Sequence, residues 1–85
     1  MQTIVHEIRG IPFFLLKIYL QEMGGRLEKR NLVVGEGWRA HLKRIEPFRI
    51  GSLVVGQTRL TLDIEETLVD DFMARLGKKT LRAGG

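Results

Sequence analysis

One predicted strand, "WRAHLKRIE", carries basic side chains at every second position, which places them on one face of a sheet. These residues are Arg39, His41 and Lys43, and the next predicted strands add Arg49 and Arg59. A cationic face of this kind attracts phosphates, small anions or an acidic protein surface. Charged side chains are also typical of the solvated face of an antiparallel sheet, so the pattern leaves both interpretations open.

A second candidate for chemistry is the pair Gly84-Gly85 at the end of "GKKTLRAGG". Carrier proteins that are loaded on their terminal carboxylate also end in Gly-Gly, because a small, extended tail must enter an activating enzyme. In such carriers a strand precedes the tail, whereas a predicted helix precedes it here. Two terminal glycines also occur by chance in about 0.5% of chains at average glycine use. We therefore expect residues 80–85 to be a flexible tail and the glycines to be unloaded.

Other residue types with catalytic potential are scattered along the sequence. The absence of cysteine excludes a cysteine nucleophile, a thiolate zinc site and an iron–sulfur cluster. His6 and His41 lie on different predicted strands, and neither stands at the spacing of a metal motif. Neighbouring carboxylates such as Asp70 and Asp71 diverge around a helix and do not converge on one point. We expect no catalytic residues, no metal and no cofactor.

Hydrophobic periodicity predicts the elements that position these residues. The predicted strands are residues 3–8, 26–37, 38–46, 48–55 and 57–65, and the predicted helices are residues 13–23 and 67–76. Gly24-Gly25 and Gly77 are placed to end the two helices. Asn31 makes its segment irregular, Pro47 is predicted to end a strand, and Gly56 is predicted to form a turn.

This β-α-β-β-β-β-α order predicts an α+β fold, in which short connections give an antiparallel sheet. Two amphipathic helices must bury their apolar stripes on one sheet face, so the other face stays open. We expect one domain over residues 1–79, since a chain of 85 residues is too short to divide. The predicted core comprises Leu16, Leu20, Leu42, Leu60, Leu62, Phe72 and Leu76.

The start of the first predicted helix suggests a docking patch. Adjacent residues on a helix point about 100° apart, so Phe13 and Phe14 cannot both enter the core. Together with Tyr19 they form a candidate surface for a homodimer or for another protein. Exposed aromatic rings that could stack on bases are not evident on the basic face, which weakens the case for single-stranded nucleic acid.

Composition sets the protein class. The 14 basic and 10 acidic side chains give a net charge of +4, which permits an anionic partner without requiring one. The longest apolar stretch, "IPFFLLKIYL", contains Lys17 and is shorter than the about 20 residues of a membrane span. It also lacks the features of a signal peptide. We expect a cytoplasmic protein with no membrane partner.

Two stretches, "IPFFLLKIYLQEMGG" and "RIEPFRIGSLVVGQTRLTLDIE", resemble the C-terminal domain of the MoaD-related proteins of Thermus-like bacteria. The shared features are a proline–aromatic helix start, a Gly-Gly helix stop, and Glu-Pro followed by Gly-Ser four residues later. The similarity extends from about His6 into the second predicted helix. In that family a ubiquitin-like, MoaD-type sulfur-carrier domain precedes this domain, whose function is unassigned. The resemblance implies that this chain corresponds to the second domain alone.

The resemblance implies a fold like that of the TATA-binding protein and a connection to molybdopterin biosynthesis, with no catalytic residue to carry over. We therefore expect a non-enzymatic accessory or binding domain whose partner is a MoaD-like carrier or its activating enzyme. Two alternatives stay open. One is a module that binds nucleic acid or another anion on the basic sheet face, and the other is a sulfur carrier loaded at Gly84-Gly85.

Overall fold

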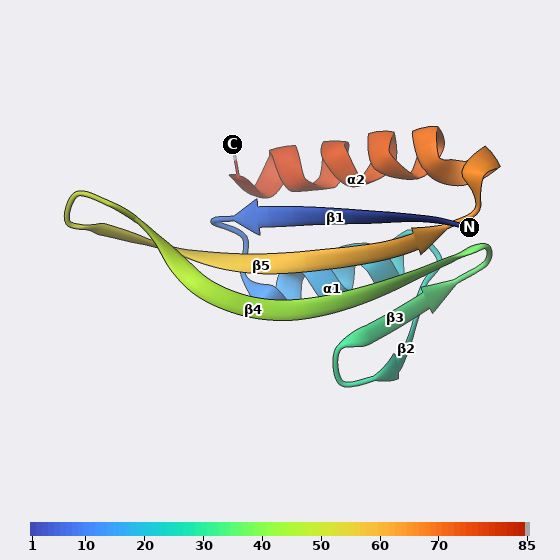
Figure 1. Ribbon diagram of the computed structural model, residues 1–85, viewed down its shortest axis with the longest axis horizontal. Helices are drawn as coiled ribbons and strands as arrows, with labels where there is room; N and C mark the ends of the chain where they lie inside the picture. Colours follow the sequence, from blue (N-terminus) through green and yellow to red (C-terminus); the bar gives the residue numbers. More distant parts are fainter. Residues whose placement is uncertain (85) are drawn as a thin grey trace.

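The computed structural model describes the backbone of residues 1–84 and the side chains of residues 1–81. It contains one five-stranded antiparallel sheet with two helices packed on one face (Figure 1). The elements are β1 (Gln2–Arg9), α1 (Phe13–Glu22), β2 (Arg26–Lys29), β3 (Leu32–Gly35), β4 (Trp38–Ile50), β5 (Leu53–Ile64), the 3-10 turn η1 (Glu66–Leu68) and α2 (Val69–Gly84). The spatial order β1-β5-β4-β3-β2 places the first strand beside the last. The α+β class and the order of elements are confirmed.

The core lies between the helices and the two long central strands. Alternate side chains of β4 and β5 face the helices as the cross-strand pairs Trp38–Ile64, Ala40–Leu62 and Leu42–Leu60. The helices cover them with Leu16, Leu20, Phe72 and Leu76. All seven residues predicted for the core are buried. The alternation predicted for residues 57–65 is therefore confirmed, and the opposite sheet face carries no helix within the described part of the chain.

Two glycines make room for Trp38 at one end of the core. Its ring packs against Phe72, with 4.9 Å between the ring centroids. A Cβ atom at Gly25 or at Gly35 would overlap the indole ring, so neither position has space for a side chain. Gly24 ends α1 in a left-handed conformation, with φ +96°. The Gly-Gly pair that was predicted as a helix stop thus also seats the tryptophan.

The segment predicted as one irregular strand over residues 26–37 is a hairpin of β2 and β3. The chain turns at Arg30 and Asn31, between the paired residues Lys29 and Leu32. The carbonyl oxygen of Asn31 accepts a hydrogen bond from the backbone N–H of Leu42, at 2.9 Å. This bond fixes the turn against β4. The irregular pattern near Asn31 in the sequence therefore marks a turn between two strands.

The prediction that Pro47 ends a strand is wrong, as is the turn predicted at Gly56. A bulge between Ile45 and Phe48 accommodates Pro47, because the bulged residues need not donate to the sheet. The turn lies instead at Gly51, whose φ of +59° suits glycine. Gly56 lies inside β5. The three strands predicted over residues 38–65 are therefore two long strands, and the segment predicted as strand 48–55 is divided between them. The total of five strands is still as predicted, because the segment 26–37 forms two strands instead of one.

The second helix does not end at Gly77 as predicted but continues to Gly84. The hydroxyl of Thr80 donates to the carbonyl of Leu76 at 3.0 Å, inside the helix. Lys79 forms an ion pair with Glu22 of α1 at 3.2 Å, which links the two helices. Residues 80–84, predicted as part of a tail, are helical. Their flexibility stays a prediction, and Gly85 lies outside the described residues.

Candidate functional site

Four of the five predicted basic residues share the open sheet face. Arg39, His41 and Lys43 are exposed along β4, and Arg59 lies opposite Lys43 on β5. This face carries no helix among residues 1–84, so the side chains meet solvent. The alternation of β4 alone was sufficient to predict the shared face of Arg39, His41 and Lys43, because no bulge interrupts residues 38–45.

Carboxylates interrupt the positive charge of this open face. Arg59 donates to one oxygen of Glu7 from Nε and from Nη2, at 3.2 and 3.1 Å. Asp63 stands opposite Arg39 in the register and accepts a hydrogen bond from Thr3 at 2.8 Å. Exposed pairs of this kind contribute at most about 1 kcal/mol to stability, but they reduce the attraction for a phosphate. The open face is therefore mixed in charge toward β1.

The structure does not bring Arg49 to the open face. Between the pairs Ile45–Gln57 and Phe48–Val55, β4 advances by three residues while β5 advances by two. The extra residue exchanges the two faces of β4 beyond the bulge, so Phe48 takes the open face and Arg49 the opposite one. Arg9, which lies on the open face of β1, accordingly packs over the ring of Phe48.

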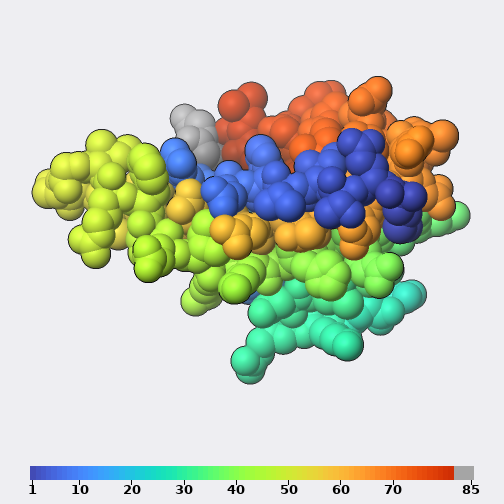
Figure 2. All heavy atoms as spheres, viewed as in Figure 1, coloured from blue at the N-terminus to red at the C-terminus, as the bar shows by residue number. Residues whose placement is uncertain are grey.

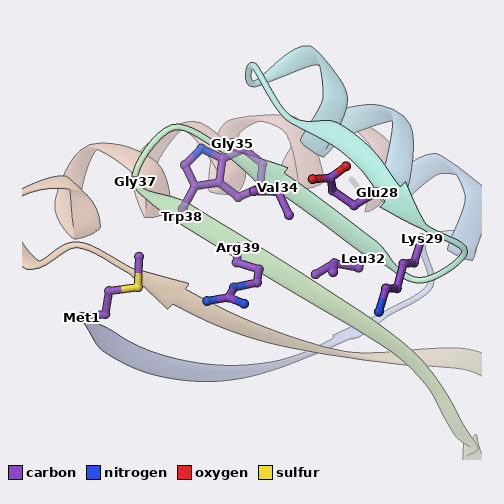
Figure 3. Close-up of a pocket in the computed structure, with 9 residues that line it drawn as sticks. All are labelled: Met1, Glu28, Lys29, Leu32, Val34, Gly35, Gly37, Trp38 and Arg39. Atoms are coloured by element: carbon purple, nitrogen blue, oxygen red, sulfur yellow. The ribbon is translucent and has the colours of Figure 1, made fainter.

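A shallow depression of about 510 Å³ adjoins Arg39 (Figure 3). In Figure 3 the Arg39 side chain lies between Met1 on one side and Leu32 on the other. The nearby carboxylate of Glu28 is within 3.3 Å of Arg26, with which it forms an ion pair. The depression thus combines apolar contacts with both signs of charge. Nothing in it resembles a nucleophile activated by a base.

The predicted aromatic patch is divided in the structure. Phe14 is 62% exposed, whereas Phe13 and Tyr19 are half-buried against the core. Ile18, one helical turn after Phe14, is 42% exposed and extends the apolar surface on α1. Tyr19 faces the other helix, with the ammonium of Lys79 5.9 Å from its ring. Only Phe14 of the three predicted residues is therefore fully available for docking.

The most prominent surface feature was missed by the sequence analysis. The tip of the β4–β5 hairpin, residues 46–56, projects beyond the rest of the molecule (Figures 1 and 2). We call it the projecting hairpin. β1 pairs with β5 only as far as Gln57, and β3 pairs with β4 only as far as His41. Within the described chain both edges of the projecting hairpin are thus without a neighbouring strand.

The projecting hairpin exposes three large apolar side chains. Ile50, Leu53 and Val54 are 59%, 61% and 54% exposed. Ile50 and Leu53 stand opposite each other next to the turn at Gly51. The run "RIGSLVV" contains the signal, since apolar residues flank a Gly-Ser turn. It was not recognised because the turn was placed five residues later.

The described residues contain no group of three or more histidine, cysteine or acidic side chains arranged to hold a metal ion. His6 alternates with the inward-facing Ile4 and Ile8 on β1, whereas His41 lies on the open face. The two histidines are thus on opposite sides of the sheet. Asp71 is within 3.8 Å of Arg75 on α2, an ordinary exposed helix pair. No helix among residues 1–84 is long and apolar enough to span a membrane.

Comparison with known proteins places the sequence in a family context. The model of a family described as archaeal MoaD-like protein matches residues 4–85. None of the curated proteins matches the sequence. The match confirms the resemblance to MoaD-related proteins and extends it over nearly the whole chain. The correspondence to the second domain of a bacterial protein and the likeness to the TATA-binding protein stay predictions.

Proposed function

The chain belongs to the archaeal MoaD-like protein family, and on this premise we propose that it is a non-enzymatic binding module of sulfur-transfer chemistry. Its partner in this proposal is a MoaD-type sulfur carrier or the enzyme that activates that carrier. The proposal includes a role in molybdopterin biosynthesis, the pathway that the resemblance implies. Docking through the projecting hairpin is the proposed mechanism.

The exposed apolar tip of the projecting hairpin carries this proposal. Ile50 and Leu53 form a cross-strand pair on one face of the ribbon next to its turn, and the exposed Val54 lies on the other face. Burial of one such side chain in an interface contributes about 1.5–3 kcal/mol. The ribbon edges also offer unpaired backbone N–H and C=O groups to an incoming strand. Both features favour a protein as the occupant, because a protein can supply an apolar surface and a strand edge together.

Charge favours a different, acidic protein over a second copy of the chain. Arg9 lies at the base of the projecting hairpin and Arg49 on one of its arms, and the whole chain carries a net charge of +4. Two copies that met at this surface would repel each other, whereas an acidic rim on a partner would complement the arginines. A homodimer through this hairpin is therefore the less favoured outcome.

The test is a calorimetric titration of the chain with a purified MoaD-type carrier and, in a separate experiment, with the enzyme that activates that carrier. The variant Ile50→Ser/Leu53→Ser removes the apolar pair, and we expect it to weaken binding at least tenfold. The matched control is Val5→Ser, because Val5 is 59% exposed on a strand but lies far from the tip. Circular dichroism checks that both variants fold. Undiminished binding by the double variant, or no binding by the unmodified chain, contradicts the proposal.

A second candidate function, binding of an anion or nucleic acid, is supported by the open sheet face. Arg39 and Lys43 lie outside the ion pairs found among the described residues, so their charge is available to a phosphate. An interaction of this kind weakens steeply with added salt, whereas apolar docking does not. Titration of single-stranded and duplex DNA at low and high salt distinguishes the two functions.

A further inference from the structure

A hollow of about 460 Å³ lies between the start of α1 and the edge of β4. β3 pairs with β4 only up to His41, so the edge of β4 at Lys43 and Arg44 has no neighbouring strand among residues 1–84. The turn at Asn31 closes the hollow on one side, held by its bond to Leu42. We call this hollow the α1–β4 site. Its volume is in the range of pockets that hold one small ligand.

The charged lining of the α1–β4 site is entirely basic. Four cationic residues line it, and they come from α1, the β2–β3 turn and β4: Lys17, Arg30, Lys43 and Arg44. The four ion pairs found among the described residues involve other basic side chains. Carboxylates compensate the open face near Arg59, but none lines this hollow. Mutual repulsion of the four cations is relieved when an anion with two or more charges enters.

Aromatic rings complement this charge. The ammonium of Lys17 lies 4.7 Å and the guanidinium carbon of Arg44 4.8 Å from the centroid of the Phe13 ring. These cation–π contacts hold both cations beside the hollow. Phe14 also lines the hollow, and with 62% of its surface exposed it presents a ring to solvent. A planar heterocycle can stack on such a ring, as bases do on aromatic side chains of nucleic-acid-binding proteins.

We propose that the α1–β4 site binds one nucleotide-sized ligand, with its phosphates on Arg30 and Arg44 and its planar ring on Phe14. Phosphate alone would use the charge but not the exposed ring, and an apolar ligand would leave four cations unpaired. A ligand that carries both groups uses both features of the lining. This site is separate from Ile50 and Leu53 at the tip of the projecting hairpin, so loss of either activity can be recognised independently.

Titrations of the uniformly ¹⁵N-labelled full chain at low salt test the proposal, with AMP, ATP, inorganic phosphate and a ten-residue oligothymidine as probes. AMP and ATP are expected to shift the backbone amide signals of residues 13–17, 30–31 and 43–44. ATP is expected to bind more tightly than AMP because it carries more charge, and both affinities are expected to fall as salt is added.

Three variants distinguish the parts of the site. Arg44→Gln is expected to weaken ATP binding about tenfold, whereas Lys78→Gln, which changes an exposed cation of α2 outside the hollow, leaves it unchanged. Phe14→Ser is expected to weaken AMP binding severalfold without changing the affinity for inorganic phosphate. The amide spectrum of each variant verifies its fold.

Four results overturn the proposal. The first is that ATP shifts no backbone amide signal, and the second is that the shifted signals belong to Arg39 and His41 on the open face. The third is that the chain binds phosphate and AMP with equal affinity and that Phe14→Ser does not change either affinity. The fourth is binding of the oligothymidine far more tightly than of ATP, which would make the site a nucleic-acid contact.

Discussion

The guanidinium carbon of Arg9 lies 3.8 Å from the centroid of the Phe48 ring, and its Nε donates to the side-chain oxygen of Gln57 at 2.8 Å. The amide nitrogen of Gln57 in turn donates to the carbonyl of Glu46 at 3.0 Å, inside the bulge of β4. Arg9 is the last residue of β1, so this chain of contacts joins the edge strand to the base of the projecting hairpin.

We expect Arg9→Ala to loosen the projecting hairpin. The change removes one cation–π contact and one hydrogen bond at a partly exposed position, a loss of about 1–2 kcal/mol. Amide hydrogen exchange of residues 48–55 should accelerate, while exchange in α1 stays unchanged. Arg49→Ala is the control, because Arg49 is exposed and forms no ion pair among the described residues. Equal exchange rates in the two variants would contradict the proposed link.

Leu62→Ala is expected to lower the free energy of unfolding by about 2–5 kcal/mol. Leu62 is fully buried in the centre of the sheet, between Ala40 of β4 and Ile4 of β1. A domain of this size has a total stability of only about 5–10 kcal/mol, so the variant lies near the limit of folding. Urea unfolding followed by circular dichroism measures the effect. Val5→Ala, at an exposed position of β1, should change it by less than about 0.5 kcal/mol.

The packing around Trp38 predicts that alanine substitutions at two strand glycines have different effects on stability. Gly35→Ala places a methyl group into the indole ring, so Trp38 must move away from Phe72. We expect a loss of about 1–3 kcal/mol and a red-shifted tryptophan emission, since the ring becomes more exposed. At Gly56 a Cβ meets no atom within 4 Å. Gly56→Ala should therefore be neutral or stabilising, and a similar loss in both variants would argue against this packing.

The pair Gly84-Gly85 is expected to stay unloaded when the chain is incubated with a carrier-activating enzyme, ATP and a sulfur donor. The reason is that residues 80–84 continue α2, whereas a loaded tail must be extended. Extension would break the hydrogen bond from Thr80 to Leu76. Intact mass spectrometry measures the outcome. Exchange of one oxygen for one sulfur, abolished by deletion of Gly85, would instead establish the carrier function.

The parts of the fold that sequence predicted are those with a local cause. The alternation of Leu60, Leu62 and Ile64 reports burial of one strand face and needs no knowledge of its partners. The position of the hairpin turn has no such local cause. Gly51 and Gly56 both follow apolar, β-branched residues, and the choice between them depends on pairing with Arg9 and on the bulge at Pro47.

The end of α2 was mispredicted for a related reason. Glycine inside a helix costs only about 1 kcal/mol relative to alanine, and this cost is small beside the packing of neighbouring residues. Leu76 is buried on one side of Gly77, and Thr80 is half-buried and hydrogen-bonded on the other. Favourable contacts on both sides therefore carry the helix through the glycine.

The α1–β4 site could not be predicted from patterns in the sequence. Its cations lie at positions 17, 30, 43 and 44, on three elements that only the tertiary fold brings together. The basic strand could be read because its residues alternate within one segment. For Phe14, the sequence predicted that one of two adjacent rings would be exposed, but not which cations surround it.

The bulge at residues 45–48 divides β4 into two stretches, and the alternation of side chains between the two sheet faces is set separately in each. Upstream of it, Trp38, Ala40 and Leu42 enter the core, and substitutions there are constrained by packing against α1 and α2. Downstream, the alternation restarts, so the sequence of the projecting hairpin can change without altering which residues face the core. A single strand thereby contains one half that is constrained by core packing and one half that is free to adapt to a partner. Insertions or exchanges at the hairpin tip should consequently be the least disruptive route to retargeting this domain.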